Sequence, residues 1–215
     1  MSFLELIGGG RPVEKPKVPN VRETKTIVID TVSSKWYDWN GINESVYKKF
    51  MSDYMKIVDE EEIYVDVTTA GGGLTYSLMI ANVLTRHKGK VTAIVRSHAL
   101  SGGTLIALAC SEIQMSEYAS LSSIDPQVWG LPIKKMLIST EPHKDEGGVG
   151  QWLRKTVEGF ASTHTKDYEK CLGLLLSKRH TNSKLVQEFF YSRDHQIPIF
   201  FDEAQNILSN LKELE

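Results

Sequence analysis

The sequence has little cysteine, little net charge and no long apolar run. Its only cysteines, Cys110 and Cys171, lie in segments of helical character, so a disulfide framework is not expected and a reducing compartment is favoured. The net charge of −2 argues against a general attraction to nucleic acid or to an anionic membrane. No stretch approaches the roughly 20 apolar residues of a membrane span, and the start MSFLELIGGGRP does not resemble a signal peptide. We therefore expect a cytoplasmic protein without a membrane span or a nucleic-acid partner.

Motifs of several other site classes are missing as well. No group of cysteines and histidines has the spacing of a metal site. Neither glycine-rich turn of the chain matches GxGxxG or GxxxxGK[ST], which leaves nucleotide binding weakly supported. The GxSxG elbow of α/β-hydrolases does not occur. We therefore expect no metal and no cofactor.

The 215 residues are enough for one α/β domain with a full core. Glycine, proline and charge without apolar periodicity predict a flexible N-terminal arm over residues 1–25, followed by a single domain over residues 26–215. Short β-branched runs alternate with helical periodicity, which predicts parallel βαβ units. The expected strands are 26–31, 62–69, 90–97, 113–115 and 119–124; the expected helices are 42–58, 74–87, 102–110, 151–176 and 183–190; a glycine- and proline-rich loop covers 130–150, and a short strand and a terminal helix close the chain.

Two glycine-rich turns, TTAGGGL and HALSGGT, each follow an expected strand and precede an expected helix. Ligands of open parallel sheets gather at this edge, beyond the carboxyl ends of the strands. Glycine lets backbone N–H groups come close to a substrate, and a helix N-terminus adds free donors. With Ser101, these are the parts of an oxyanion hole beside a hydroxyl. A serine before a helix is also a common N-cap, and a glycine triplet can also cradle a phosphate.

The order strand–AGGG–helix–strand–HALSGG–helix–strand–SSIDPQ resembles the ClpP/crotonase superfamily. It is most similar to the serine peptidase branch that contains signal peptide peptidase A and the serine dehydrogenase proteinases. The resemblance is most specific over residues 98–127, and the tail DHQIPIFFDEAQNIL also looks like the closing segment of that branch. It implies an α/β, ClpP/crotonase-like fold of repeated ββα and βαβ units with a C-terminal helical segment, assembled as a homo-oligomer.

By this resemblance, Ser101 matches the nucleophile, and the N–H of Gly102 matches one oxyanion donor. Gly71 and Gly72 match the glycines that complete the oxyanion hole. Ala70 departs from the usual proline of the family at the start of that turn, and we expect a small effect because proline there mainly stiffens the turn.

The base that activates the serine is harder to place. ClpP has a histidine downstream of the serine, near the position where this chain has Asp125. The peptidase A branch instead uses a lysine, which must be neutral and therefore partly buried to accept a proton. Counting back from the tail places that lysine near residues 162–163, and Lys155 and Lys166 flank this point on one helix face. Either lysine can also be an ordinary solvated helix residue, and His164 is a further candidate. His98, three residues before Ser101, is another candidate, with an ordinary packed or solvated histidine as the alternative.

The resemblance thus predicts a serine peptidase that cleaves a peptide or protein substrate through an acyl-enzyme at Ser101, with a Ser-Lys dyad and a backbone oxyanion hole. The alternative is a catalytically inactive subunit of the same fold that serves as an oligomeric scaffold or a peptide-binding module. A third interpretation is an acyl-CoA enzyme of the crotonase type, which the SGG turn disfavours.

Overall fold

The computed structural model describes residues 25–31, 41–58, 60–128, 131–133 and 148–214. Residues 1–24 of the predicted N-terminal arm lie outside the described residues, and so does most of the predicted loop at 130–150. The division into an arm and one domain stays a prediction.

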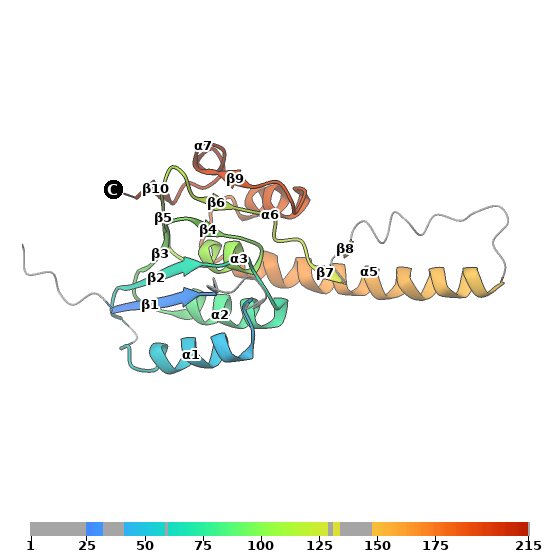
Figure 1. The fold of residues 1–215 in the computed structure, drawn as a ribbon, viewed down its shortest axis with the longest axis horizontal. Coiled ribbons are helices and arrows are strands. Elements are labelled where there is room, and N and C mark those ends of the chain that lie inside the picture. Colours follow the sequence, from blue (N-terminus) through green and yellow to red (C-terminus); the bar gives the residue numbers. More distant parts are fainter. Residues whose placement is uncertain (1–24, 32–40, 59, 129–130, 134–147, 215) are drawn as a thin grey trace, which may run out of the picture.

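A five-stranded parallel sheet forms the centre of the fold (Figure 1). Its strands, in spatial order, are β1 (Lys25–Asp30), β2 (Ile63–Thr68), β3 (Val91–Val95), β5 (Glu112–Met115) and β10 (Leu211–Glu213). Every neighbouring pair is parallel, as the alternation of strands and helices predicted. In β1 and β2 every second residue is buried, whereas all of β3 is buried, which is the pattern of a central strand covered on both faces.

A smaller sheet and a hairpin extend this core. The smaller sheet contains β4 (His98–Ala99), β6 (Ser120–Leu121) and β9 (Ile199–Phe200), and the hairpin joins β7 (Gln127–Val128) to β8 (Leu131–Pro132). Strand β4 pairs with β6 in parallel, and β9 joins β6 in the antiparallel direction. The C-terminal part of the chain therefore lies against the segment that follows the SGG turn.

The helices connect the strands and cover the central sheet. They are α1 (Glu44–Tyr54), α2 (Leu74–Arg86), α3 (Gly102–Leu108), α5 (Gly148–Leu176), α6 (Ser183–Ser192) and α7 (Phe201–Gln205). The Asn43 side chain accepts a hydrogen bond from the Val46 N–H and caps α1, a favourable start for a helix. None of the described helices is long and apolar enough to cross a membrane.

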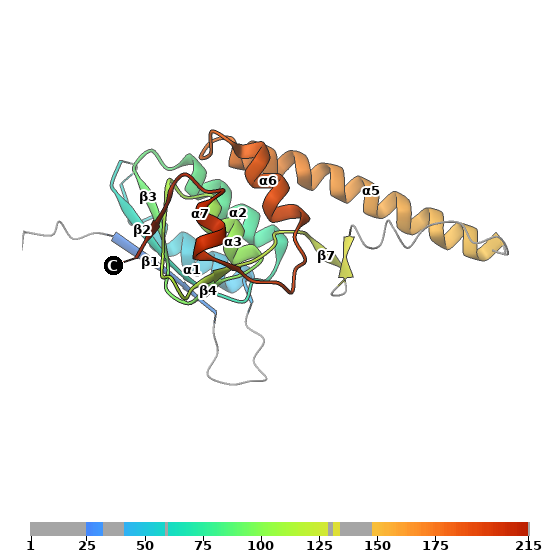
Figure 2. The ribbon, with the colours of Figure 1, turned by 90° about the horizontal axis from the view of Figure 1, so that it is seen from above.

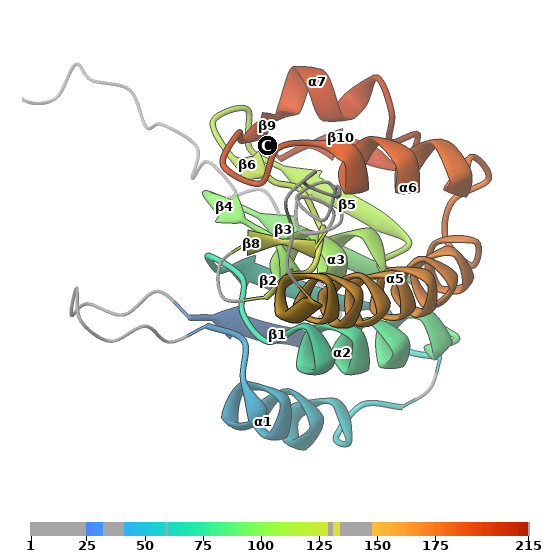
Figure 3. The ribbon, with the colours of Figure 1, turned by 90° about the vertical axis from the view of Figure 1, so that its right-hand side faces the viewer.

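Helix α5 packs against the other helices at one end and projects beyond them at the other. Its C-terminal half packs between α2 and α6 (Figure 3), whereas its N-terminal half extends beyond the other described elements (Figure 2). The guanidinium of Arg179, just after α5, donates hydrogen bonds to Leu84 O near the end of α2 and to Ala109 O at the end of α3. Because carbonyls at helix C-termini carry partial negative charge, this contact fixes the packed end of α5 against both helices.

The structure confirms the predicted strands and helices to within a few residues at most ends, and it adds three features. The short strand β4 forms within the HALSGG segment, and the hairpin of β7 and β8 begins at the last residue of SSIDPQ. The predicted terminal helix is correct but short, because α7 ends at Gln205 and the chain then adds β10 to the edge of the central sheet.

Candidate active site

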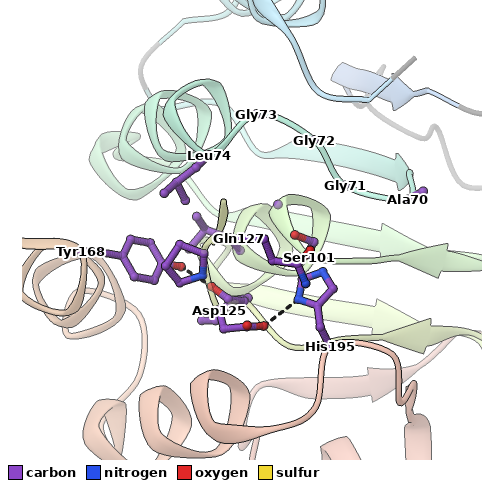
Figure 4. Close-up of a pocket in the computed structure, with 14 residues that line it drawn as sticks. Ala70, Gly71, Gly72, Gly73, Leu74, Ser101, Asp125, Gln127, Tyr168 and His195 are labelled. Carbon is purple, nitrogen blue, oxygen red and sulfur yellow. Dashed lines mark hydrogen bonds and ion pairs between the residues drawn. The ribbon is translucent and has the colours of Figure 1, made fainter. Parts of the chain in front are cut away.

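A pocket of about 350 Å³ lies where the two glycine turns meet. Its lining comes from residues 70–74, from Ser101, Gly102 and Leu105, from residues 124–127, and from Tyr168 and His195 (Figure 4). These residues come from the turns after β2 and β4, from the starts of α2 and α3, from the segment that joins β6 to β7, from α5 and from the connection before β9. The pocket lies at the edge that the parallel sheet predicted for a ligand.

Ser101 has the only positive φ among the described non-glycine residues, with φ 50° and ψ −114°. L-amino acids rarely adopt this conformation, and it persists only where the surroundings hold it. Here the Ser101 N–H donates to Ser122 Oγ at 2.7 Å, and the carbonyl of the preceding Leu100 accepts from the Gly103 N–H at 2.7 Å. The Ser101 side chain makes no cap hydrogen bond to α3, so the N-cap interpretation of this serine does not describe the site.

The AGGG turn passes directly over this serine. A Cβ on Gly71 would lie 2.7 Å from Ser101 Cβ and 3.3 Å from its Oγ, and Gly71 has a φ of 108°. The N–H of Gly71 donates to Thr69 Oγ1 at 3.0 Å, so this N–H is already occupied. Gly71 thus shapes the turn and allows its close approach.

Two other backbone N–H groups remain open to the pocket. Ile42 donates to Gly71 O and accepts from the Gly73 N–H, so the N–H of Gly72, which lies between them, points to the opposite side, as alternate groups of an extended chain do. Within the described part of the chain, neither the Gly72 N–H nor the Gly102 N–H has a hydrogen-bond partner. Two free donors beside a serine hydroxyl are the components of an oxyanion hole.

The close packing of α3 explains why glycine follows the serine. A Cβ on Gly102 would lie 2.1 Å from Ser77 Oγ on α2, and one on Gly103 would lie 2.4 Å from Thr69 Cγ2. The small residues let the start of α3 approach both α2 and the AGGG turn. The two N–H donors can therefore face one pocket.

A hydrogen-bonded carboxylate–histidine pair forms another wall of the pocket. His195 Nδ1 lies 2.6 Å from Asp125 Oδ1, and the side chains are 22% and 6% exposed respectively. The same carboxylate oxygen accepts from Ser123 Oγ at 2.6 Å. In the view of Figure 4, the ring of His195 lies between the Asp125 carboxylate and the Ser101 side chain. Asp125 thus holds the histidine at the pocket wall.

Tyr168 on α5 holds the loop that carries Asp125. Its hydroxyl donates to Ile124 O at 2.6 Å, and the ring is buried against Tyr191. Burial, with a smaller contribution from Tyr191, raises the pKa of the Tyr168 hydroxyl well above its usual range. The hydroxyl therefore stays a donor at neutral pH, and the contact ties α5 to the pocket.

The predicted base residues stand apart from this arrangement. Lys155 and Lys166 are exposed on α5, and within the described part of the chain no lysine lines the pocket. His164 is also exposed on the same helix. The structure brings together Ser101 and the three predicted oxyanion glycines and does not bring either lysine to them. Of the described residues, no group of three or more histidines, cysteines and carboxylates is placed to hold a metal ion.

Sequence reasoning missed His195, which is 94 residues from Ser101 in a segment noted only as part of the tail. One signal pointed toward it. Asp125 stands near the position where ClpP has a histidine, and a carboxylate buried at a pocket requires a partner. The tail histidine in DHQIPIF is the partner that the fold supplies.

Comparisons with known proteins show which family the chain is similar to. A family model described as "ClpP-like SDH-type serine proteinase" matches residues 38–153. The matched range includes Ser101 and Asp125 and ends before His195.

Three individual proteins are similar. The chain is 37% identical over 154 residues to the uncharacterized protein MJ0137 of Methanocaldococcus jannaschii. These aligned residues make up 69% of this chain and 52% of that protein. The chain is 40% identical over 79 residues to the uncharacterized protein MJ1495 of the same organism, which covers 36% of this chain and 27% of that protein. The chain therefore spans about half or less of the relatives that it matches. A solved structure of a mutant of the membrane-bound stomatin-specific protease 1510-N shares the fold with a TM-score of 0.53 at 19% identity, covering 78% of this chain and 72% of that one.

Proposed function

The chain belongs to the family of ClpP-like SDH-type serine proteinases, and from this membership we propose that it is an active serine peptidase with Ser101 as its nucleophile. The observation that carries the proposal is the strained backbone of Ser101, φ 50°, beside the N–H groups of Gly72 and Gly102, which have no hydrogen-bond partner among the described residues. Strain of this kind costs on the order of 1–3 kcal/mol and is typical of functional sites.

In the proposed reaction, Ser101 Oγ attacks the carbonyl carbon of a peptide bond and loses its proton to a base. The N–H groups of Gly72 and Gly102 stabilise the negative charge on the former carbonyl oxygen. Removing one such donor typically lowers the rate about 10²–10³-fold. The intermediate collapses to an acyl-enzyme as the amine leaves, and water then releases the acid and restores Ser101.

The substrate in this proposal is a peptide or protein segment bound in extended form. Residues 71–73 already pair with Ile42 on one side, through Gly71 O and the Gly73 N–H. The opposite side of this turn faces the pocket and can accept another extended strand, a common mode of peptide binding.

A lysine base stays a prediction. Lys155 and Lys166 are exposed outside the pocket, so a Ser-Lys dyad needs a lysine that reaches Ser101 from elsewhere. The assembly into a homo-oligomer and the cytoplasmic location also stay predictions. Exposed Val149 and Trp152 on the outer part of α5 favour the assembly, because large apolar side chains on a projecting helix are typical of contact surfaces. Sedimentation analysis of the purified chain tests the oligomer.

A fluorophosphonate probe tests the nucleophile. We expect the wild-type chain to be labelled and Ser101→Ala to stay unlabelled, while Ser97→Ala is the matched control. Ser97 is exposed and lies four residues before Ser101, so its loss leaves labelling unchanged. A folded wild-type chain that is not labelled assigns the protein to the inactive scaffold or peptide-binding alternative, and binding of a CoA thioester by that chain supports the acyl-CoA alternative.

A further inference from the structure

We propose that Ser122 is a positioning residue for the reaction, because its hydroxyl holds the backbone of Ser101 in the strained conformation that directs the nucleophile and the Gly102 N–H to the pocket. This role rests on the proposed function, since it concerns how the nucleophile turn is kept in its working form. Ser122 is 3% exposed and lies outside the pocket lining. It therefore acts through Ser101 and not by contact with the substrate.

The turn at Ser101 has a geometry that normally requires glycine. Leu100 O accepts from the Gly103 N–H at 2.7 Å, and Ser101 between them has φ 50° and ψ −114°. These values match the first central position of a type II′ turn, which glycine usually occupies because a Cβ is unfavourable there. The chain has a serine at this position, so contacts outside the turn must hold it in this form.

The strain can be relieved by rotation of the peptide group between Leu100 and Ser101. The following helix is less free to move, because every residue of α3 is buried and the Leu105 N–H donates to Ser101 O at 3.1 Å. Rotation of the peptide group toward a negative φ turns the Ser101 N–H away from its present direction. An acceptor that binds this N–H therefore opposes the relaxation.

The hydroxyl of Ser122 is that acceptor. Ser122 Oγ accepts the Ser101 N–H at 2.7 Å and donates its own hydrogen to Ser123 O at 3.2 Å, so its oxygen is left to accept. Among the described residues, the Ser101 N–H has no other acceptor. Since a peptide N–H that loses its partner away from water is costly, removal of the hydroxyl favours the rotation that relieves the strain.

Ser122 is itself fixed relative to the strand that leads to the nucleophile. Strands β4 and β6 pair Ala99 with Leu121 and end at this pair, so Ser122 is the first residue beyond the paired strands. The Ser122 N–H donates to Thr104 Oγ1 at 3.0 Å, and Thr104 Oγ1 donates to Ala99 O at 2.6 Å. Thr104 is completely buried. A side-chain acceptor thus stands where the backbone pairing of the two strands stops.

This conformation gives the two N–H groups of the turn different tasks. The Ser101 N–H binds Ser122, whereas the Gly102 N–H has no partner among the described residues and is left for the carbonyl oxygen of a substrate. Relaxation of the turn changes the directions of the Ser101 side chain and of the Gly102 N–H together. It therefore lowers the share of molecules in which attack and oxyanion binding can occur at once.

Fluorophosphonate labelling at several probe concentrations tests this role, because it separates probe binding (KI) from the rate of the chemical step (kinact). Ser122→Ala is expected to lower kinact about 5–150-fold, the Boltzmann factor of the usual cost of such backbone strain, and to leave KI unchanged. Partial unfolding would instead reduce the number of labelled molecules without changing kinact in those that are folded.

Ser111→Ala is the matched control. Ser111 Oγ also accepts a backbone N–H, that of Val91 at 3.3 Å, together with a hydrogen bond from Arg179 at 3.0 Å. It lies beyond the opposite end of α3 and outside the pocket lining. This variant is expected to have a lower melting temperature than wild type but the wild-type kinact.

A crystal structure of Ser122→Ala tests the cause of the effect, and the φ of Ser101 is expected to become negative in it. If the alanine variant does not fold, Ser122→Cys takes its place in both measurements. The cysteine sulfur is a much weaker acceptor than the serine oxygen, so the same decrease in kinact is expected.

The outcomes separate this role from the proposed function. Wild-type kinact in folded Ser122→Ala, together with no labelling of Ser101→Ala, would overturn the role of Ser122 and leave the nucleophile in place. An unchanged φ of Ser101 in the variant crystal, or an equal loss of kinact in Ser111→Ala, would also overturn it. If the folded wild-type chain is not labelled, both the proposed function and this role in the reaction are wrong.

Discussion

Replacing Tyr168 with phenylalanine removes one hydroxyl from the contact between α5 and the active-site loop. That hydroxyl donates to Ile124 O at 2.6 Å, and the two residues are 5% and 3% exposed. Within the described structure this carbonyl has no other partner, so the substitution leaves a buried acceptor unsatisfied. The phenyl ring keeps the contact with Tyr191, which limits the change to one hydrogen bond.

We expect Tyr168→Phe to lower the free energy of unfolding by about 1–2 kcal/mol, the usual cost of leaving a buried polar group without its partner. For a chain of this size, that corresponds to a decrease of roughly 2–8 °C in melting temperature. Urea unfolding and thermal unfolding measure the two quantities. Because Ile124 precedes Asp125, the rate of Ser101 labelling is also expected to decrease.

Tyr118→Phe is the matched control, because Tyr118 is 82% exposed. This variant is expected to change stability by less than about 0.5 kcal/mol, as is usual at the surface. If Tyr168→Phe is as stable as Tyr118→Phe and labels at the wild-type rate, the hydroxyl does not hold the loop and α5 does not support the site.

Three further predictions concern the turn, the cysteines and the sheet edge. Gly71→Ala places a Cβ 2.7 Å from Ser101 Cβ, at a backbone φ of 108°, and should abolish fluorophosphonate labelling. In the control Gly148→Ala, the new Cβ has no atom within 4 Å, so labelling should be unchanged. Burial raises the pKa of Cys110 to about 12, while Cys171 is exposed. Iodoacetamide should therefore alkylate one cysteine in the native chain and both in urea. Alkylation of both cysteines in the native chain would show that the core around Cys110 is open. Burial favours the neutral carboxyl of Glu112, but hydrogen bonds from two lysines and a glutamine lower its pKa on balance. Glu112→Gln should therefore lower the free energy of unfolding at pH 7. The difference in stability from wild type should shrink as pH falls through the lowered pKa, because the wild-type carboxylate then becomes protonated. A deficit that is constant with pH contradicts the ion-pair argument.

The fold could be predicted from the sequence where local patterns and burial agree. The β-branched runs predicted β1, β2 and β3, and the apolar periodicity predicted α1 and α2. The strand β10 was missed because Leu211–Glu213 is short, and its pairing with β5 depends on a neighbour about 100 residues away. Such pairing carries no local signal.

The candidate site also contains residues with a local sequence pattern and residues whose place depends on distant contacts. Ser101 and the glycines were found because backbone geometry near a helix start demands small residues in a short, readable pattern. His195 was missed because its place at the pocket wall depends on one side-chain contact with Asp125, which only the folded chain creates. The resemblance to lysine-dependent peptidases also favoured a base in the middle of the chain, whereas His195 lies near its end.

Mass-spectrometric mapping of the fluorophosphonate adduct tests the central claim most directly. Trypsin is expected to release residues 97–134 as one peptide, and these include Ser101 together with several other serines. Fragmentation of this peptide should place a single adduct on Ser101. An adduct on any other residue, or a folded chain that carries none, would contradict the assignment of Ser101 as the nucleophile.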